Sequence, residues 1–264
     1  MKAAIVTGSD SGIGRATAIA LASSGHDVGV TFHTDEEGAS RTARAIASLG
    51  RRALVRGLEL ADPAGAAATI DELAADLGRL DVLVNNAGAN HRAPVLDEDL
   101  DSWRHTLDVN LTGPFACAQA AARRMVEQGD GGRIVFVTSV HEHEPLRHAV
   151  AYSAAKAGSG MAARTMALEL AEHGITVNAV APGHVATPMT GKDGVDPYTV
   201  ALPQIPLGRP AAPAEIAALI AWLASREASY VTGASVVADG GLLLTAAVAL
   251  QEAVEGSMDT AGSQ

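Results

Sequence analysis

Residues 2–14 read KAAIVTGSDSGIG, and this stretch decides the fold. Residues 3–7 are an apolar run typical of a strand, and they lead directly into Gly8, Gly12 and Gly14 and then into a helical pattern. Glycine permits a tight turn and a close backbone approach, while a helix N-terminus offers free N–H groups to an anion. The spacing is G-x-x-x-G-x-G, not the commoner G-x-G-x-x-G. By itself the stretch fits either a plain tight turn or a pyrophosphate-binding turn.

The alternation of strand and helix continues along the chain. Short apolar runs predict strands at 3–7, 27–32, 52–57, 81–85, 133–138, 176–180 and 235–238, and helical periodicity predicts helices at 14–24, 36–49, 63–77, 102–127 and 151–173. The continuous apolar strands indicate a parallel sheet covered on both faces. We therefore expect an α/β fold, a single-domain doubly wound parallel sheet (Rossmann fold), over residues 1–242. A substrate lid is expected at about 188–204, and a partly disordered tail at 243–264.

Composition excludes several classes of protein. The chain has 264 residues, a formal net charge of −11 and one cysteine, Cys117. The negative charge argues against nucleic-acid binding, and no apolar run reaches the ~18 residues of a membrane span. A lone cysteine forms no internal disulfide and fits a reducing compartment. The strand that starts within five residues leaves no room for a signal peptide. We expect a cytoplasmic protein that binds neither nucleic acid nor membrane.

Candidate functional residues follow two later strands. The fourth predicted strand ends in the run from Asn85 to Gly88, which suits a flat ring lying against the backbone but also an ordinary turn. Ser139 comes directly after the fifth predicted strand, at a place where a serine is commonly a helix cap. Doubly wound sheets bind ligands beyond the carboxyl ends of their strands, so both positions are candidates for a site.

Tyr152 and Lys156 lie four residues apart in the helical stretch AYSAAKAG, so both side chains point from one helix face. The chain has sixteen arginines but only three lysines and three tyrosines, which makes a chance pairing of these two types rare. A tyrosine with its usual pKa of about 10 is a poor acid–base catalyst at neutral pH, and a nearby ammonium lowers that pKa. A solvated helical pair is the alternative; the rarity of both residues favours catalysis.

Together these motifs resemble the short-chain dehydrogenase/reductase family, and its 3-oxoacyl-carrier-protein-reductase-like branch in particular. The resemblance covers about residues 1–242 and rests on TGSDSGIG at 7–14, NNAG at 85–88, Asn110 in DVNLTG, Ser139, YSAAK at 152–156, APG at 181–183 with Thr187, and DGG at 239–241. It implies an NAD(P)-dependent oxidoreductase that interconverts a carbonyl and an alcohol and needs no metal.

The resemblance also implies a role for each matching residue. Tyr152 would donate the proton to the substrate oxygen, and Lys156 would hold the nicotinamide ribose and lower the tyrosine pKa. Ser139 would polarise the carbonyl, and Asn110 would anchor a water that relays protons from Lys156. The cofactor would contact Gly8, Ser11, Gly12, Ile13, Gly14, His33, Thr34, Glu59, Leu60, Asn86, Ala87, Gly88, Tyr152, Lys156, Pro182, Gly183, Val185 and Thr187.

The end of the second strand bears on the choice of nicotinamide. Family members that prefer NAD usually carry an aspartate there, and Phe32 stands at that position. His33 and Thr34 follow, and they suit hydrogen bonds to a 2′-phosphate, whereas Asp10 and Asp35 add negative charge nearby. The prediction is NADP(H), with NAD(H) as the alternative.

Histidines near Ser139 suggest the kind of substrate. His141 and His143 should line the rim of the substrate cleft, with His184 and Met189 as further candidates. A His-x-His pair also raises a metal site, but a polar rim loop is the preferred interpretation. These side chains favour a polar substrate over a long acyl chain. A chain of net charge −11 would also repel an acidic carrier protein, so we expect a small ketone, diketone, sugar or polyol in preference to a carrier-protein thioester.

Two other functions stay open: a 3-oxoacyl-thioester reductase, and a cofactor-binding sensor or scaffold without catalysis. The second is disfavoured because the acid–base residues are all present. The long alanine-rich helices expected at 102–127 and 151–173 would pair between subunits, as family members commonly do, giving a homotetramer or homodimer. The alternative is that both helices are buried against their own sheet.

Overall fold

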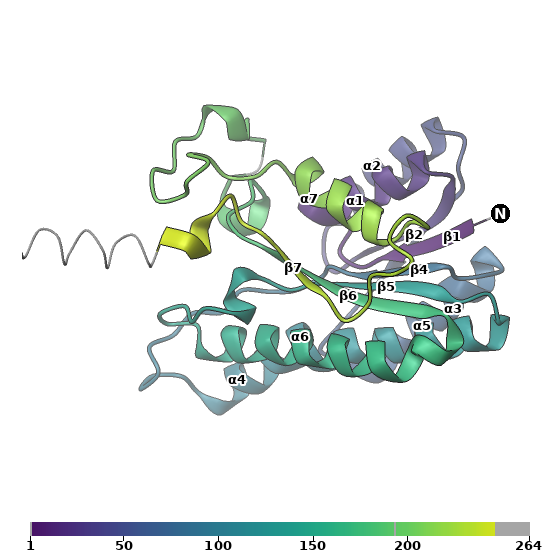
Figure 1. Cartoon of the computed structure of the whole chain (residues 1–264), viewed down its shortest axis with the longest axis horizontal. Coiled ribbons are helices and arrows are strands. Elements are labelled where there is room, and N and C mark those ends of the chain that lie inside the picture. Colours follow the sequence, from purple (N-terminus) through teal and green to yellow (C-terminus); the bar gives the residue numbers. More distant parts are fainter. Residues whose placement is uncertain (1, 193, 246–264) are drawn as a thin grey trace, which may run out of the picture.

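Seven parallel strands form the central sheet of the computed structural model, which describes residues 2–192 and 194–245 (Figure 1). The strands are β1 Lys2–Val6, β2 His26–Phe32, β3 Ala53–Gly57, β4 Val82–Asn85, β5 Gly132–Val137, β6 Ile175–Pro182 and β7 Ser235–Ala238. Their spatial order is β3-β2-β1-β4-β5-β6-β7, so the direction of strand addition reverses between β1 and β4. The predicted doubly wound parallel sheet is confirmed. A crevice opens beyond the carboxyl ends of the strands at such a reversal.

Helices cover both faces of the sheet. They are α1 Gly12–Ser23, α2 Glu36–Ser48, α3 Pro63–Leu77, α4 Leu100–Leu107, α5 Gly113–Gln128, α6 Val150–Leu170 and α7 Pro213–Leu223. Figure 1 shows α1, α2 and α7 on one face and α3, α5 and α6 on the other. Short 3-10 turns occur at Val140–Glu142, Ala171–His173, Pro188–Thr190, Pro197–Thr199 and Leu242–Leu244.

Two apolar cores, one on each face, hold the sheet in place. Side chains alternate along a strand, so Ala3 and Ile5 of β1 enter the core under α3 and α5, while Ala4 and Val6 enter the core under α1 and α7. All four are buried. Each fully buried aliphatic side chain contributes about 1.5–3 kcal/mol, so the strands form a rigid base for the loops that follow them.

One predicted helix is divided, and one observed helix was not predicted. The stretch expected at 102–127 consists of α4 and α5 with a π-helical turn, Asp108–Thr112, between them. The unpredicted helix is α7, although its start carries two recognisable signals. Pro213 occupies its first turn, and the Glu215 carboxylate accepts a hydrogen bond from the Ala212 N–H at 2.8 Å.

The expected lid and tail are irregular where the structure describes them. The segment 188–204 contains two 3-10 turns. Of the expected tail, residues 243 and 244 belong to the 3-10 turn Leu242–Leu244, and residue 245 follows it. The rest of the expected tail, residues 246–264, lies outside the described residues, and so does its expected disorder. Within 2–192 and 194–245, no helix combines the length and the apolar character needed to cross a membrane.

Candidate active site

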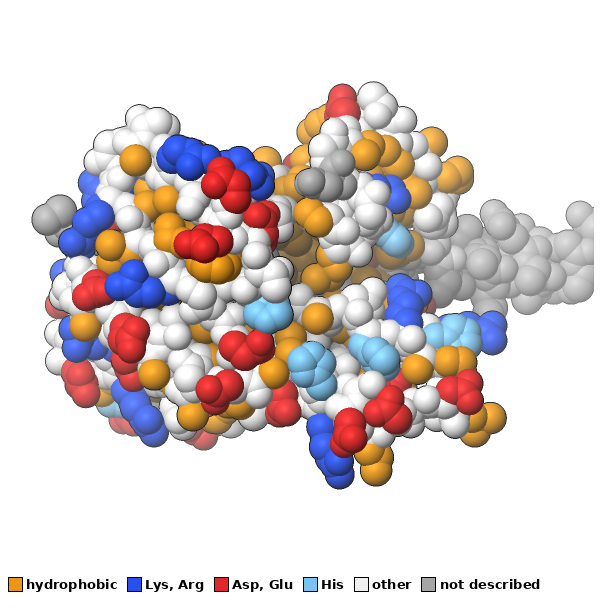
Figure 2. Space-filling model, turned by 180° about the vertical axis from the view of Figure 1, so that it is seen from behind, with side chains coloured by type: hydrophobic (Ala, Val, Ile, Leu, Met, Phe, Trp, Pro, Cys, Tyr) orange, Lys and Arg blue, Asp and Glu red, His pale blue; other side chains and the backbone are white. Residues whose placement is uncertain are grey.

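A pocket of ≈ 380 Å³ lies beyond the carboxyl ends of the strands, within the size range of small-molecule sites. Figure 2 shows this side of the molecule hollowed, with histidines gathered along the lower edge of the hollow. The pocket brings together most residues predicted for cofactor and catalysis: Gly8, Ser11, Gly12, Ile13, His33, Thr34, Glu59, Leu60, Asn86, Ala87, Gly88, Asn110, Ser139, Tyr152, Lys156, Pro182, Gly183, Val185 and Thr187, together with Met189.

The glycine turn forms one wall of the pocket. Gly8 and Gly12 have φ of +60° and +52°, a region that favours glycine. A Cβ on Gly14 would overlap the Gly8 carbonyl oxygen, so Gly14 packs the turn against itself and does not line the pocket. Ser11 is the N-cap of α1, but its side chain accepts no hydrogen bond from the first turn, which also lacks acidic residues. The N–H groups of that turn are thus left for an anionic ligand, which fits the pyrophosphate of a dinucleotide.

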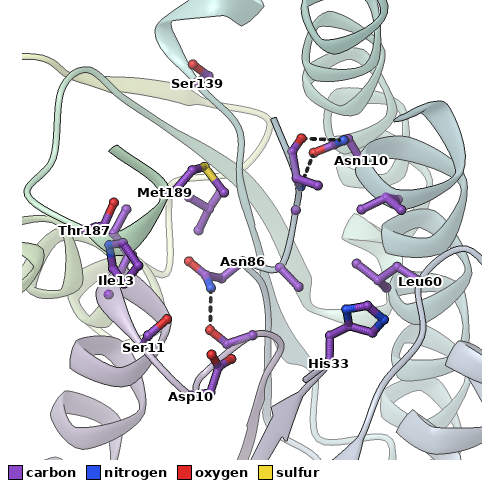
Figure 3. A pocket seen from close by; sticks show the side chains of 18 of the residues that line it. Asp10, Ser11, Ile13, His33, Leu60, Asn86, Asn110, Ser139, Thr187 and Met189 are labelled. Atoms are coloured by element: carbon purple, nitrogen blue, oxygen red, sulfur yellow. Dashed lines mark hydrogen bonds between the residues drawn. The ribbon is translucent and has the colours of Figure 1, made fainter. Parts of the chain in front are cut away.

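The loop after β4 is tied to the glycine turn by hydrogen bonds. The Thr7 hydroxyl oxygen accepts the backbone N–H groups of Asn86 and Ala87, both at 2.9 Å. The Asn86 side-chain amide donates to the carbonyls of Thr7 at 2.9 Å and Gly8 at 3.0 Å (Figure 3). The loop is therefore more than an ordinary turn, since it fixes the spacing between β1 and β4 at the floor of the pocket.

His33 lies at the opposite end of the pocket from Ser139 (Figure 3), and its imidazole is paired with a carboxylate. His33 Nε2 is 2.8 Å from Glu59 Oε2, and both side chains are at least half exposed. The Ala61 N–H, and then His33, hold the pKa of Glu59 below its ordinary value. The imidazole expected to meet a 2′-phosphate is thus paired with a carboxylate. Thr34 lines the same end of the pocket.

The π-helical turn is built around Asn110, which is buried. Its side-chain amide donates to the carbonyls of Ala89 and Thr106, both at 3.0 Å, and its side-chain oxygen accepts the Ala89 N–H at 3.2 Å. Its backbone carbonyl accepts the Ser159 hydroxyl at 2.8 Å. A widened turn of this kind is frequent at functional sites, and here it places Asn110 between the loop after β4 and α6.

Tyr152 and Lys156 enter the pocket from one face of α6, and both are buried. Lys156 Nζ lies 5.6 Å from the centroid of the Tyr152 ring and donates a hydrogen bond to the Val137 carbonyl at 3.1 Å. Ser139 is the N-cap of the 3-10 turn that follows β5, and its hydroxyl accepts the His141 N–H at 3.2 Å. It lies close enough to Tyr152 to act on the pKa of that phenol. The three side chains therefore meet where β5 ends.

The ionisation of this group differs from expectation in one respect. Burial raises the pKa of Tyr152, while the Ser139 hydroxyl and the charge of Arg92 oppose the rise. Lys156 is not among the groups that shift the Tyr152 pKa here, so a lowering of that pKa by Lys156 stays a prediction. Burial also lowers the pKa of Lys156 to about 8, and the negative charge of Glu142 opposes this shift.

The residues predicted for substrate lie in different places. Met189 lines the pocket (Figure 3), whereas His141 is not a lining residue; its ring meets the Tyr152 ring edge-on at 6.4 Å between centroids. His143 does not reach the cleft, because its Nε2 is held at 3.1 Å from the Ser235 hydroxyl of β7. His184 is not a lining residue, and burial, followed by the charges of Lys192, His141 and Arg92, lowers its pKa.

Several lining residues were not predicted. They are Asp10, Thr31, Phe32, Leu58, Ala89, His105, Val109, Val137, Thr138, Pro188 and Thr190. Most of them are next to a predicted residue in the sequence, at or near the end of a strand. That position is the signal that could have identified them. His105 lies on α4 and reaches the pocket through packing alone. In the described part of the chain, no group of three or more His, Cys, Asp or Glu side chains forms a metal-binding cluster.

Comparison with known proteins decides the family. Residues 7–243 match a family model described as enoyl-(acyl carrier protein) reductase. The oxidoreductase YohF of Escherichia coli K12 is 53% identical over 241 residues, 91% of this chain and 95% of that protein. This chain belongs to the short-chain dehydrogenase/reductase family.

Solved structures agree with this assignment. The acetoin dehydrogenase YohF from Salmonella typhimurium is 52% identical, with a TM-score of 0.87 over 92% of this chain and 96% of its own. The carveol dehydrogenase from Mycobacterium avium, solved in complex with NAD, is 29% identical, with a TM-score of 0.84 over 92% and 98%. The short-chain dehydrogenase/reductase described here is therefore an NAD(P)-dependent oxidoreductase, and its glycine turn and uncapped α1 fit the dinucleotide that the family binds.

Proposed function

We propose that this enzyme interconverts a small ketone and a secondary alcohol with NAD(P)(H), and that Tyr152 is its general acid and base. The observation that carries the proposal is that Ser139, Tyr152 and the buried Lys156 line one pocket, with Lys156 Nζ 5.6 Å from the Tyr152 ring and the glycine turn in the same pocket. The chemistry that a bound nicotinamide supplies is transfer of a hydride to or from the carbonyl carbon.

The side chains of the pocket would handle the proton. In reduction, Ser139 donates a hydrogen bond to the carbonyl oxygen, and Tyr152 transfers its phenolic proton to that oxygen as the alcohol forms. In oxidation, the phenolate of Tyr152 removes the proton again. The ammonium of Lys156, 5.6 Å from the ring, stabilises the phenolate, and Asn110 holds the loop after β4 against α6.

For the cofactor, we propose NADP(H) in preference to NAD(H). Phe32 stands where an acid would bind the two ribose hydroxyls, and His33 and Thr34 line the pocket directly after it. The pairing of His33 with Glu59 weakens this preference. The Glu59 carboxylate repels a 2′-phosphate, and it occupies the His33 imidazole that would otherwise donate a hydrogen bond to that phosphate. Use of NAD(H) as well follows from that balance.

For the substrate, we propose a ketone that carries a second oxygen, such as an α-hydroxy ketone or a diketone. The His141 ring meets the Tyr152 ring, and Arg92 acts electrostatically on both Tyr152 and His184. These donors suit a polar neighbour of the reacting carbonyl better than a long acyl chain. The Salmonella typhimurium relative is named an acetoin dehydrogenase, which agrees with this class.

The test follows the absorbance of reduced nicotinamide with NADPH and NADH in parallel, against acetoin, diacetyl and simple ketones. We expect turnover that is lost in Tyr152→Phe while cofactor binding stays within about twofold of wild type. Turnover that persists in Tyr152→Phe would rule out the assigned acid. Tight cofactor binding without turnover of any ketone would favour the sensor function.

We also propose that the enzyme is a homotetramer or homodimer. Large apolar side chains stay exposed on the two helices expected to pair, namely Phe115 on α5 and Met161 and Leu168 on α6. Leu168 is 81% exposed. Sedimentation velocity would show a single species of two or four chains, and a monomer at micromolar concentration would contradict the proposal.

A further inference from the structure

Glu142 is a buried carboxylate to which the proposed chemistry assigns no role. It ends the 3-10 turn Val140–Glu142 and comes three residues after Ser139. Its side chain is only 3% exposed. Glutamate is almost never this buried unless it is paired, so its environment calls for an explanation.

Three donors from three different elements satisfy this carboxylate. Glu142 Oε2 accepts the hydroxyl of Thr138 at 2.7 Å, directly after β5, and that of Ser235 on β7 at 3.0 Å. Its Oε1 accepts a guanidinium N–H of Arg164 on α6 at 3.3 Å. An ionised carboxylate accepts hydrogen bonds on both oxygens, so this set suits the charged form. Glu142 therefore ties the turn after Ser139 to two strands and to α6.

The carboxylate lies against the face of α6 that carries the proposed acid. Tyr152, Lys156, Gly160 and Arg164 are spaced four residues apart and form one stripe along the helix. A Cβ on Gly160 would overlap the carboxylate of Glu142, so the absence of a side chain there makes room for it. The negative charge thus sits one helical turn from Lys156, on the same side of the helix.

The charged groups around the carboxylate and the lysine are few and can be named. Arg164 and His143 face Glu142, the latter with Nε2 3.8 Å from Oε1. Tyr152 faces Lys156, and Glu142 is the charge that counteracts the effect of burial on Lys156. Removing the Glu142 charge leaves burial unopposed, so a smaller fraction of Lys156 is protonated at a given pH.

We propose that Glu142 is a positioning residue for the Tyr152–Lys156 pair: its carboxylate anchors the turn that holds Ser139 and places a negative charge one helical turn from the buried Lys156 amine. The inference rests on the proposed function, in which Lys156 serves Tyr152. Glu142 itself would not touch the substrate and would act through the residues that do.

The scarcity of lysine makes a direct test practical. With ε-13C-labelled lysine, the cofactor-free enzyme gives three lysine signals by NMR, and Lys2→Arg and Lys192→Arg identify the signal of Lys156. In Glu142→Gln, which keeps the size of the side chain, we expect the titration of Lys156 to move to lower pH. Glu144→Gln, at an exposed acid in the same segment, should leave it in place. An unmoved Lys156 titration in Glu142→Gln would overturn the inference.

Kinetics separate this role from a merely structural one. Glu142→Gln should lower kcat for ketone reduction about tenfold with little change in the KM of the cofactor. The alkaline limb of the pH profile of kcat should also move to lower pH. Ser235→Ala removes one donor but keeps the charge, so it should lower kcat less and leave the Lys156 titration unchanged. Ser235→Ala also remains informative if Glu142→Gln does not fold: a Lys156 titration that moves as far in Ser235→Ala would contradict a role for the charge. Retained turnover in Tyr152→Phe would instead count against the proposed function.

Discussion

The Thr7 hydroxyl offers a direct test of how the pocket floor is held. It is buried at the end of β1 and accepts the N–H groups of Asn86 and Ala87, both at 2.9 Å. Thr7→Val keeps the shape of the side chain and removes the hydroxyl, which also donates a long hydrogen bond to the Val84 carbonyl at 3.5 Å. Both N–H groups of the loop after β4 then lose their partner, and both residues are half-buried.

The expected loss can be estimated from these two bonds. Leaving a buried N–H unpaired costs about 1–3 kcal/mol; because these two groups are only partly buried, the free energy of unfolding should fall by about 2–4 kcal/mol in total. For a chain of this size the melting temperature should fall by roughly 10 °C. Because Ala87 and Gly88 line the pocket, the dissociation constant for NADPH should also rise about tenfold.

The chain contains a matched control in Thr17. It is also fully buried, on α1, but its hydroxyl has no hydrogen-bond partner among the described residues. Thr17→Val removes an unpaired polar group and should leave stability unchanged or improved. Thermal denaturation followed by circular dichroism, with NADPH binding by fluorescence, measures both variants. Equal melting temperatures for Thr7→Val and Thr17→Val would refute the reasoning.

Three further predictions follow from the described charges and burial. Glu59→Gln frees His33, so the ratio of kcat/KM for NADPH over NADH should rise roughly threefold to fivefold, and a fall in that ratio would contradict the assigned 2′-phosphate contact. The pKa of Lys156 is lowered from 10.5 to about 8, so between these pH values the unfolded state binds more protons than the folded state and the free energy of unfolding rises with pH. The difference in the free energy of urea unfolding between wild type and Lys156→Met should show this rise, and a difference that does not change with pH would refute it. Burial raises the pKa of Cys117 to about 12, so iodoacetamide at pH 8 should label it only at the rate of unfolding, and rapid labelling of folded enzyme would contradict that burial.

Much of the fold could be predicted because its signals are local. Each strand is a short apolar run and each helix has its own periodicity, so all seven predicted strands are present with ends shifted by at most two residues. The division of the predicted helix at 102–127 could not be foreseen. The π-helical turn depends on bonds from Asn110 to Ala89, which is 21 residues away, and to Ser159, which is 49 residues away.

The candidate site divides in the same way. The glycine turn and the four-residue spacing of Tyr152 and Lys156 follow from backbone geometry, and the structure brings them into one pocket. The placement of His143 could not be read from its neighbours in the chain. It faces Ser235, 92 residues away, because β7 lies beside β6.

By itself, the sequence determined the order of strands and helices, the glycine turn and the identity of the residues at the strand ends, because each depends on a few neighbouring residues. Only the tertiary structure decided the charge environment of the site: the pairing of His33 with Glu59, the burial that shifts the pKa of Tyr152, and the enclosure of Glu142. Burial and hydrogen bonding between residues far apart in the chain arise when the helices pack on the sheet, and local sequence patterns carry no record of either.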